Sequence, residues 1–340
     1  MLPVIFGLSG PVMTAAERAL FRDTDPAGFI LFARNIEDPE QLRALTDSLR
    51  DLTGRAAIPI LIDQEGGRVT RLGSPHWRSW PAARTLAGSA NCSEPERLAS
   101  AVERVRCNFE ALALELAGMG VTVTCAPVLD VPQPDAHDII GDRAFGASPE
   151  LVSILGSACL EGLQLGGVAG VIKHLPGHGR ALSDSHESLP RVSATAAELE
   201  QDFAPFRALS NASMAMTAHV GYDALDKAHC ASLSPTVIET HIRQHIGFDG
   251  LLISDDLDMK ALAGDIPSRA VAVLTAGCDI ALNCWGRLDD MQGIAEQVPA
   301  MTPEAARRLA VATQRCGIVT DSAALTARIN ALIARRDALQ

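Results

Sequence analysis

Eight short apolar runs recur along the chain, each rich in residues that favour strands. They are VIFGLSG, GFILFARN, IPILIDQEGG, VTVTCAPVLDV, VAGVIKHLPG, SMAMTAHVGY, GLLISDDLD and CDIALNCW. Most of these runs are continuously apolar and do not alternate with polar residues, which is typical of strands that are buried on both faces of a parallel sheet. The pattern therefore predicts eight parallel strands.

Segments with helical character separate these runs. They cover residues 14–22, 39–52, 95–117, 149–165, 194–209, 235–246 and 268–276, and further helices follow toward the C-terminus. Several start at a capping residue followed by proline, as at Asp38-Pro39 and Ser148-Pro149, which is the preferred chemistry of a first helical turn. No glycine-rich dinucleotide fingerprint follows the first strand. We therefore expect an α/β fold, a single (β/α)8 TIM-type barrel, with one domain over residues 1–340 and a C-terminal helical extension over about 301–340.

Composition narrows the class of partner. The 340 residues carry a formal net charge of −12 and are 47% apolar. An acidic chain without clustered Lys and Arg predicts a small-molecule substrate, no nucleic acid and no membrane partner. The first residues lack the basic flank of a signal peptide, and eight scattered cysteines without a C-x-x-C pair suit a reduced compartment. We expect a cytoplasmic protein without a cofactor, and a monomer is compatible with the sequence.

Polar residues gather where the predicted strands end. In barrels of this type the active site lies at that end of the strands. The candidates follow five different strands, so the fold would bring distant segments to one face. They are Asp63 and Arg71 after the third strand, Arg143 after the fourth, Lys173 and His174 at the end of the fifth, His219 after the sixth, and Asp255 and Asp256 at the end of the seventh.

The segment KHLPGHGRALSDSHESLP, residues 173–190, holds three histidines. Asp184 and His186 stand two residues apart, so in an extended segment their side chains project to the same side. An aspartate bonded to one ring nitrogen would fix the tautomer of the imidazole and leave the other nitrogen to transfer a proton. The connection from 177 to 193 has no periodicity, which is typical of a functional loop. We expect a mobile loop with hinges at Gly177 and Gly179.

Alternatives stay open for these residues. Asp184 and the histidines at 174, 178 and 186 could ligate zinc in a metal-dependent hydrolase, although catalytic metal sites usually draw ligands from several strand ends. His178 could simply shape a turn between glycines. Lys173 could form a Schiff base, but hydrogen bonding to a polar substrate fits its acidic and basic neighbours better. A noncatalytic ligand-binding protein is the remaining class.

The pair Asp255-Asp256 ends the run LLISDD. A carboxylate at the end of a buried strand is costly unless it has a partner or a chemical task. Asp255 lies nearer the strand end and is our candidate nucleophile. For Asp256 we expect a structural role in a salt bridge or a helix cap.

These motifs together resemble the single-domain bacterial β-N-acetylglucosaminidases of glycoside hydrolase family 3. The resemblance rests on KHLPGHGRALSDSH and SDDLDM, supported by DQEGGRV and GDRAF, and it extends over nearly the whole chain. It implies that Asp255 is the nucleophile and that His186, oriented by Asp184, is the acid/base. It also implies that the substrate is bound by Asp63, Arg71, Arg143, Lys173 and His174, with no metal and no cofactor.

The reaction implied by this resemblance is removal of terminal β-linked N-acetylglucosamine (GlcNAc) with retention of configuration. Retention follows from a covalent glycosyl-enzyme, here on Asp255. The noncatalytic alternative is a protein that binds this amino sugar without turnover. The implied substrates are GlcNAc-1,6-anhydro-MurNAc muropeptides, the fragments released during peptidoglycan recycling.

Overall fold

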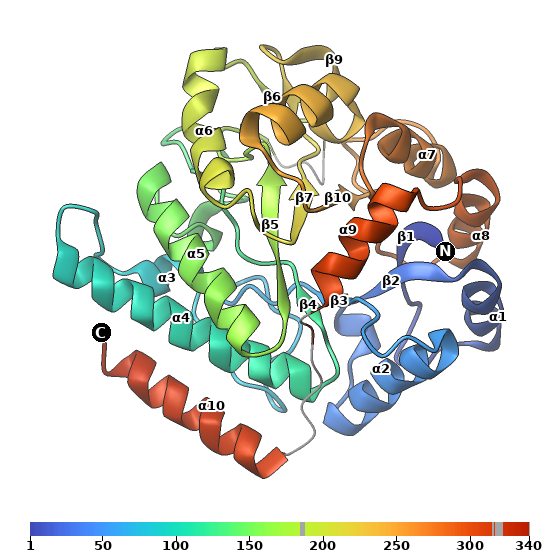
Figure 1. Cartoon of the computed structure of the whole chain (residues 1–340), viewed down its shortest axis with the longest axis horizontal. Helices are drawn as coiled ribbons and strands as arrows, with labels where there is room; N and C mark the ends of the chain where they lie inside the picture. Colours follow the sequence, from blue (N-terminus) through green and yellow to red (C-terminus); the bar gives the residue numbers. More distant parts are fainter. Residues whose placement is uncertain (184–187, 315, 317–321, 340) are drawn as a thin grey trace.

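Eight parallel strands close into a barrel in the computed structural model, which describes residues 1–183, 188–314, 316 and 322–339 (Figure 1). Around the barrel the order is β1, β11, β10, β7, β5, β4, β3 and β2. Each strand overlaps one of the eight predicted apolar runs, so the predicted (β/α)8 fold is confirmed. The barrel strands are β1 (Leu2–Gly7), β2 (Pro26–Leu31), β3 (Ile60–Ile62), β4 (Val123–Thr124), β5 (Ala169–Leu175), β7 (Met214–Thr217), β10 (Leu251–Asp256) and β11 (Ile280–Asn283).

Helices pack around the barrel and follow the predicted segments closely. Asp38 and Ser148 cap α2 and α5 with their side chains, as the Asp-Pro and Ser-Pro pairs indicated. The predicted helix at 235–246 is a π-helix over Val237–Ile246, and the short α3 was not predicted. The α-helices are α1 (Ala15–Thr24), α2 (Pro39–Thr53), α3 (Ala83–Ala87), α4 (Pro95–Gly118), α5 (Pro149–Leu165), α6 (Ala196–Ala208), α7 (Ile266–Ala276), α8 (Leu288–Gln297), α9 (Pro303–Thr313) and α10 (Ser322–Asp337).

Apolar side chains fill both faces of the barrel strands. Along β1, Ile5 belongs to the cluster inside the barrel, whereas its neighbours Val4 and Phe6 belong to the cluster shared with the helices. Adjacent residues of a strand point to opposite faces, so a strand buried on both sides needs an unbroken apolar run. This burial explains why the runs in the sequence are continuous.

The last two helices occupy different places. Leu309 and Ala312 of α9 pack with the cluster inside the barrel. The helix α10 lies alongside α4 on the outside, where Arg328 contacts Glu110 at 2.6 Å (Figure 1). Within the described part of the chain, no helix combines the length and apolarity needed to cross a membrane.

A small three-stranded sheet lies beside the barrel and corrects two predictions. The run SMAMTAHVGY was expected to be one strand, but β7 ends at Thr217 and Gly221–Tyr222 forms β8 in the second sheet. The connection expected to lack structure up to 193 ends in β6 (Arg191–Val192), which pairs with β8. Strand β9 (Asp226–Cys230) completes this sheet. Both differences arise because short pairings depend on a partner that is distant in sequence.

Candidate active site

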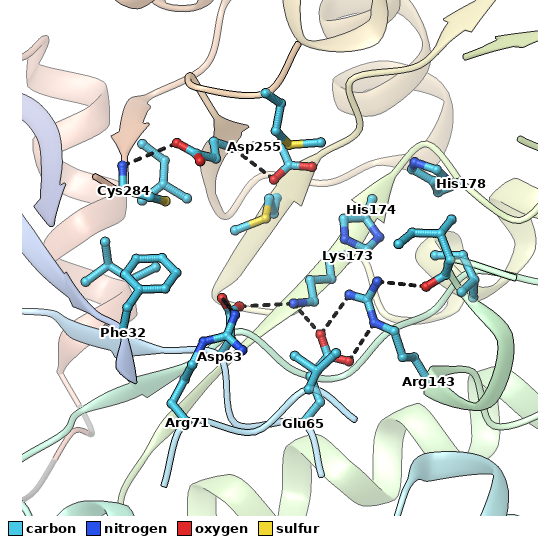
Figure 2. Close-up of a pocket in the computed structure, with 18 of the residues that line it drawn as sticks. Phe32, Asp63, Glu65, Arg71, Arg143, Lys173, His174, His178, Asp255 and Cys284 are labelled. Carbon is cyan, nitrogen blue, oxygen red and sulfur yellow. Dashed lines mark hydrogen bonds and ion pairs between the residues drawn. The ribbon is translucent and has the colours of Figure 1, made fainter. Parts of the chain in front are cut away.

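One pocket collects most of the predicted site residues that the structure describes (Figure 2). It lies where β3, β5, β10 and β11 end, and the 3-10 turn Gly141–Arg143 completes its wall. The fold thus brings together residues that are up to about two hundred positions apart in sequence, as expected for strand ends of one barrel. The ionisable side chains that line the pocket are Asp63, Glu65, Arg68, Arg71, Arg143, Lys173, His174, His178, Asp255, Asp256 and Cys284.

One wall of the pocket, called the charged wall below, is formed by Asp63, Glu65, Arg71, Arg143 and Lys173. The buried carboxylate of Glu65 lies at its centre. Glu65 accepts two hydrogen bonds from Arg143, at 2.9 and 2.8 Å, and lies 2.6 Å from Lys173 Nζ. Burial alone would raise the pKa of Glu65, but the Arg143 and Lys173 charges hold it below its usual range. Burial alone would lower the pKa of Lys173, but Glu65 and Asp63 outweigh it and raise that pKa. Both cations therefore stay charged beside the pocket.

The turn in the DQEGG segment positions Glu65 at the pocket. Gly66 and Gly67 both have positive φ, at 93° and 58°. A Cβ on Gly66 would lie 2.3 Å from the Pro81 carbonyl oxygen, so only glycine fits this close approach. The Gln64 side chain accepts the N–H of Arg71 at 2.8 Å and holds the return segment in place.

Asp63 and Arg71 form the open part of the charged wall. Arg71 Nη2 lies 3.1 Å from Asp63 Oδ2, and Lys173 Nζ lies 3.4 Å from Asp63 Oδ1. Figure 2 shows Lys173 directed between the carboxylates of Asp63 and Glu65. Since Glu65 is nearer to the ammonium, the partly exposed Asp63 carboxylate retains the capacity to accept hydroxyl groups. The wall thus offers donors and acceptors for a polyhydroxylated ligand.

Asp130 holds the two histidines that line the pocket. Its Oδ2 lies 2.7 Å from His174 Nδ1, and its Oδ1 accepts the backbone N–H groups of His174 at 3.2 Å and His178 at 2.6 Å. Burial would raise the pKa of Asp130, but His174 lowers it, so the carboxylate is ionised and accepts the Nδ1 proton. This bond fixes the orientation of the His174 ring. Burial and the neighbouring His174 lower the pKa of His178 to about 4, which keeps it neutral near pH 7.

The two aspartates of β10 have different surroundings. Asp255 Oδ1 accepts the N–H of Asp256 at 2.9 Å, and both residues line the pocket. Asp256 Oδ1 accepts backbone N–H groups from Asp258 at 3.2 Å and Cys284 at 3.3 Å, and burial raises its pKa to about 6. The prediction of a salt bridge or helix cap for Asp256 was therefore wrong, because its Oδ1 instead accepts hydrogen bonds from backbone N–H groups of two loops.

Asp184 and His186 lie outside the described residues. The described start of their loop is tightly packed. A Cβ on Gly177 would lie 2.8 Å from Asp202 Cβ, and a Cβ on Gly179 would lie 2.1 Å from the Val131 carbonyl oxygen. The Tyr222 hydroxyl also donates to the Gly177 carbonyl at 2.7 Å. These contacts give the two glycines a packing role at the base of the loop, and the expected hinges stay a prediction.

Sequence reasoning gave Glu65 and Asp130 no role in the site, although both follow predicted strands. The signal for Glu65 was its place two residues after Asp63, and the signal for Asp130 was its place at the end of the VTVTCAPVLD run. The candidate His219 is buried under the wall, with its Nε2 3.0 Å from the Asp256 carbonyl oxygen. Among residues 1–183, 188–314, 316 and 322–339, no group of three or more His, Cys, Asp or Glu is placed to hold a metal ion.

Comparisons with known proteins agree on one family. Residues 5–316 match the model of the glycosyl hydrolase family 3 N-terminal domain. The chain is 38% identical to the β-hexosaminidase of Chromobacterium violaceum, over 99% of this chain and 96% of that protein. It is 37% identical to the β-hexosaminidase of Bordetella avium, over 90% and 87% of the two chains.

A solved structure supports the same relationship. NagZ from Neisseria gonorrhoeae, crystallised in complex with N-trifluoroacetyl-D-glucosamine, superposes with a TM-score of 0.87 at 32% identity, covering 99% of this chain and 97% of that one. A second crystal structure of the same NagZ contains a zinc ion, with a TM-score of 0.86 at 31% identity and the same coverage.

Proposed function

The chain belongs to glycosyl hydrolase family 3, and we propose that it is a retaining exo-β-N-acetylglucosaminidase working through Asp255. Its class, a glycoside hydrolase of the β-N-acetylhexosaminidase type, follows from the β-hexosaminidases and the NagZ structure that it matches over nearly its whole length. The proposal adds the stereochemical course, the residues and the natural substrate, and it treats residues 1–340 as one domain.

One observation carries the proposal. Asp255, at the end of β10, lines the same pocket as the hydrogen-bonding groups of Asp63, Lys173, His174 and Arg143. Three of these groups are held by buried carboxylates, because Glu65 binds Arg143 and Lys173, and Asp130 binds His174. Fixed groups of this kind orient a sugar without having to reorganise when it binds. A carboxylate beside an oriented sugar is the arrangement that glycosyl transfer to an enzyme needs.

The proposed reaction has two steps. In the first, an Asp255 oxygen bonds to the anomeric carbon while the glycosidic C–O bond breaks and His186 gives its proton to the leaving oxygen. In the second, His186 takes a proton from water, the water oxygen bonds to the anomeric carbon, and the bond to Asp255 breaks. Two inversions give net retention. Asp184 would orient His186 by accepting a hydrogen bond from one ring nitrogen, which leaves the other nitrogen to give its proton in the first step and to take one from water in the second.

The proposed natural substrates are GlcNAc-1,6-anhydro-MurNAc muropeptides, handled in the cytoplasm during peptidoglycan recycling. The binding of N-trifluoroacetyl-D-glucosamine by the NagZ of Neisseria gonorrhoeae supports an N-acylglucosamine ring in the pocket. The acidic net charge of −12 supports a small saccharide ligand over nucleic acid or an anionic membrane. No cofactor takes part in this chemistry.

The test is turnover of p-nitrophenyl β-N-acetylglucosaminide, with the anomeric configuration of the released sugar followed by NMR. We expect the β-anomer to form first. Initial release of the α-anomer would contradict the covalent route, and absence of turnover would contradict the proposed activity.

A further inference from the structure

We propose that Trp285 is a stacking platform for the sugar ring of the leaving group, beside the pocket. This inference rests on the proposed function and extends it from the sugar that is transferred to the group that departs. It is carried by the exposure of Trp285, by its contacts with Arg34, by the rigidity of its loop and by its place around the barrel.

Trp285 directly follows a residue that lines the pocket. It follows β11 directly after Cys284, which lines the pocket and donates its backbone N–H to Asp256 Oδ1 at 3.3 Å. Cys284, which precedes Trp285, thus contacts Asp256, which follows the candidate nucleophile Asp255. Trp285 nevertheless leaves 53% of its surface open to solvent. A single exposed apolar residue needs no explanation, but an exposed Trp beside a pocket offers a ligand a large apolar surface with few rotatable bonds.

Two further residues extend the pocket wall toward Trp285. The guanidinium of Arg34 lies 4.9 Å from the centre of the Phe32 ring and 5.8 Å from the centre of the Trp285 ring. Phe32 lines the pocket. Arg34 is fixed in turn by the Leu8 carbonyl at 2.8 Å and by the Cys284 carbonyl. Phe32, Arg34 and Trp285 therefore form one continuous rim between the pocket and the surface.

The loop that carries Trp285 is held firmly on its other side. Gly286 has a φ of 66°, and a Cβ there would lie 2.4 Å from the Leu8 carbonyl carbon. Arg287 pairs with Asp258, which follows β10, and with Asp290 at 2.5 Å. An aromatic ring on a fixed backbone loses little conformational entropy when a ligand stacks on it.

The barrel order indicates which part of the ligand reaches this rim. Asp63 and Lys173, proposed to bind sugar hydroxyls, come from β3 and β5, whereas Asp255 comes from β10. Strand β11 adjoins β10 and is separated from both β3 and β5 by two intervening strands. A sugar with its hydroxyls at β3 and β5 and its anomeric carbon at Asp255 has its anomeric end toward β10 and β11, and the leaving group departs from that end on the face opposite Asp255. The group that meets Trp285 is therefore the leaving sugar ring, whose C–H face suits an aromatic surface.

The experiment compares two substrates of the same enzyme. The leaving group of N-acetyl-β-glucosaminyl fluoride is a single atom, whereas that of N,N′-diacetylchitobiose is a complete sugar. In Trp285→Ala we expect kcat/KM for the disaccharide to fall roughly tenfold, with the fluoride unchanged. Trp285→Phe should restore part of the loss. Leu165→Ala, which shortens a 46% exposed side chain on the outer helix α5, should change neither substrate.

Equal losses for the two substrates would overturn the inference, because they would assign Trp285 to the shape of the pocket and not to the leaving group. An unchanged disaccharide in Trp285→Ala would overturn it as well. If the wild-type enzyme hydrolysed neither substrate, the proposed function itself would fail, and that result is separate from any effect of the variants.

Discussion

Two buried glutamates show how similar chemistry serves different ends in this molecule. Glu65 and Glu110 each leave only 5% of their surface exposed, and each binds two cations. Glu65 holds Arg143 and Lys173 at the pocket. Glu110 lies on α4 at the outer surface of the barrel, where it lies 3.2 Å from Arg106 and 2.6 Å from Arg328 of α10.

The difference lies in what the cations face. Arg143 and Lys173 line the pocket beside Asp63 and His174. The partners of Glu110 face helices and solvent, and the Arg328 side chain is 51% exposed. A buried ion pair is therefore weak evidence of function by itself. The geometry around the cations decides whether the pair positions a ligand or joins two helices, so we expect changes at the pocket to affect catalysis and changes at the α4–α10 contact to affect stability alone.

The largest effect should come from Asp255→Ala, which is the strongest test that changes at the pocket affect catalysis. Without a carboxylate no glycosyl-enzyme can form, so we expect turnover to fall roughly 10⁴-fold or more. The urea midpoint of unfolding should change little, because the partly exposed Asp255 side chain lies in an open pocket. The matched control is Asp256→Ala, and a severe loss there with a mild one at Asp255 would reverse the assignment.

His186→Ala should give the next largest effect, and one that depends on the leaving group. Departure of dinitrophenol needs no proton, so this variant should slow deglycosylation more than glycosylation for that substrate. Stopped-flow absorbance should then show a burst of product. Similar losses for good and poor leaving groups, without a burst, would mean that His186 does not act as the acid/base.

Measuring Glu65→Gln and Glu110→Gln side by side tests directly whether the two buried glutamates have different roles. Removing the Glu65 charge leaves Lys173 buried with only the more distant Asp63, so we expect a loss of about 3 kcal/mol in unfolding free energy. We also expect a roughly hundredfold loss in kcat/KM, mainly as a raised KM, because Lys173 and Arg143 lose their orientation.

In Glu110→Gln the partners remain partly solvated, and we expect a loss of about 1 kcal/mol with unchanged kcat and KM. Denaturant unfolding and initial rates, measured on both variants, check the two expectations together. An unchanged KM in Glu65→Gln, or a raised KM in Glu110→Gln, would contradict the distinction between the two clusters. Glu65→Asp should recover part of the binding if charge and orientation are what Glu65 supplies.

Chelation should have the smallest effect. The proposed chemistry uses Asp255 and His186 and needs no metal, so EDTA should leave turnover of the nitrophenyl substrate unchanged. A complete loss that zinc restores would instead support the metal-dependent alternative. Because the NagZ of Neisseria gonorrhoeae has also been crystallised with zinc, added zinc should be titrated separately from chelation.

The sequence by itself determined the barrel. Continuous apolar runs specify strands buried on both faces, and capping residues set the starts of helices such as α2 and α5, because these signals act within a few residues. The motifs around Asp63, Lys173 and Asp255 also located the pocket at the strand ends, since parallel strands of one barrel end on one face.

Only the tertiary structure decided which groups hold the site in place. Glu65 and Arg143 are 78 positions apart, and only the folded structure shows that Glu65 binds Arg143. Asp130 likewise becomes the partner of His174 only when β4 and β5 lie side by side. The rim of Phe32, Arg34 and Trp285 joins segments about 250 residues apart through contacts that have no local signature. Side-chain contacts between distant segments depend on how the barrel closes, and the pattern of any single segment does not contain that information.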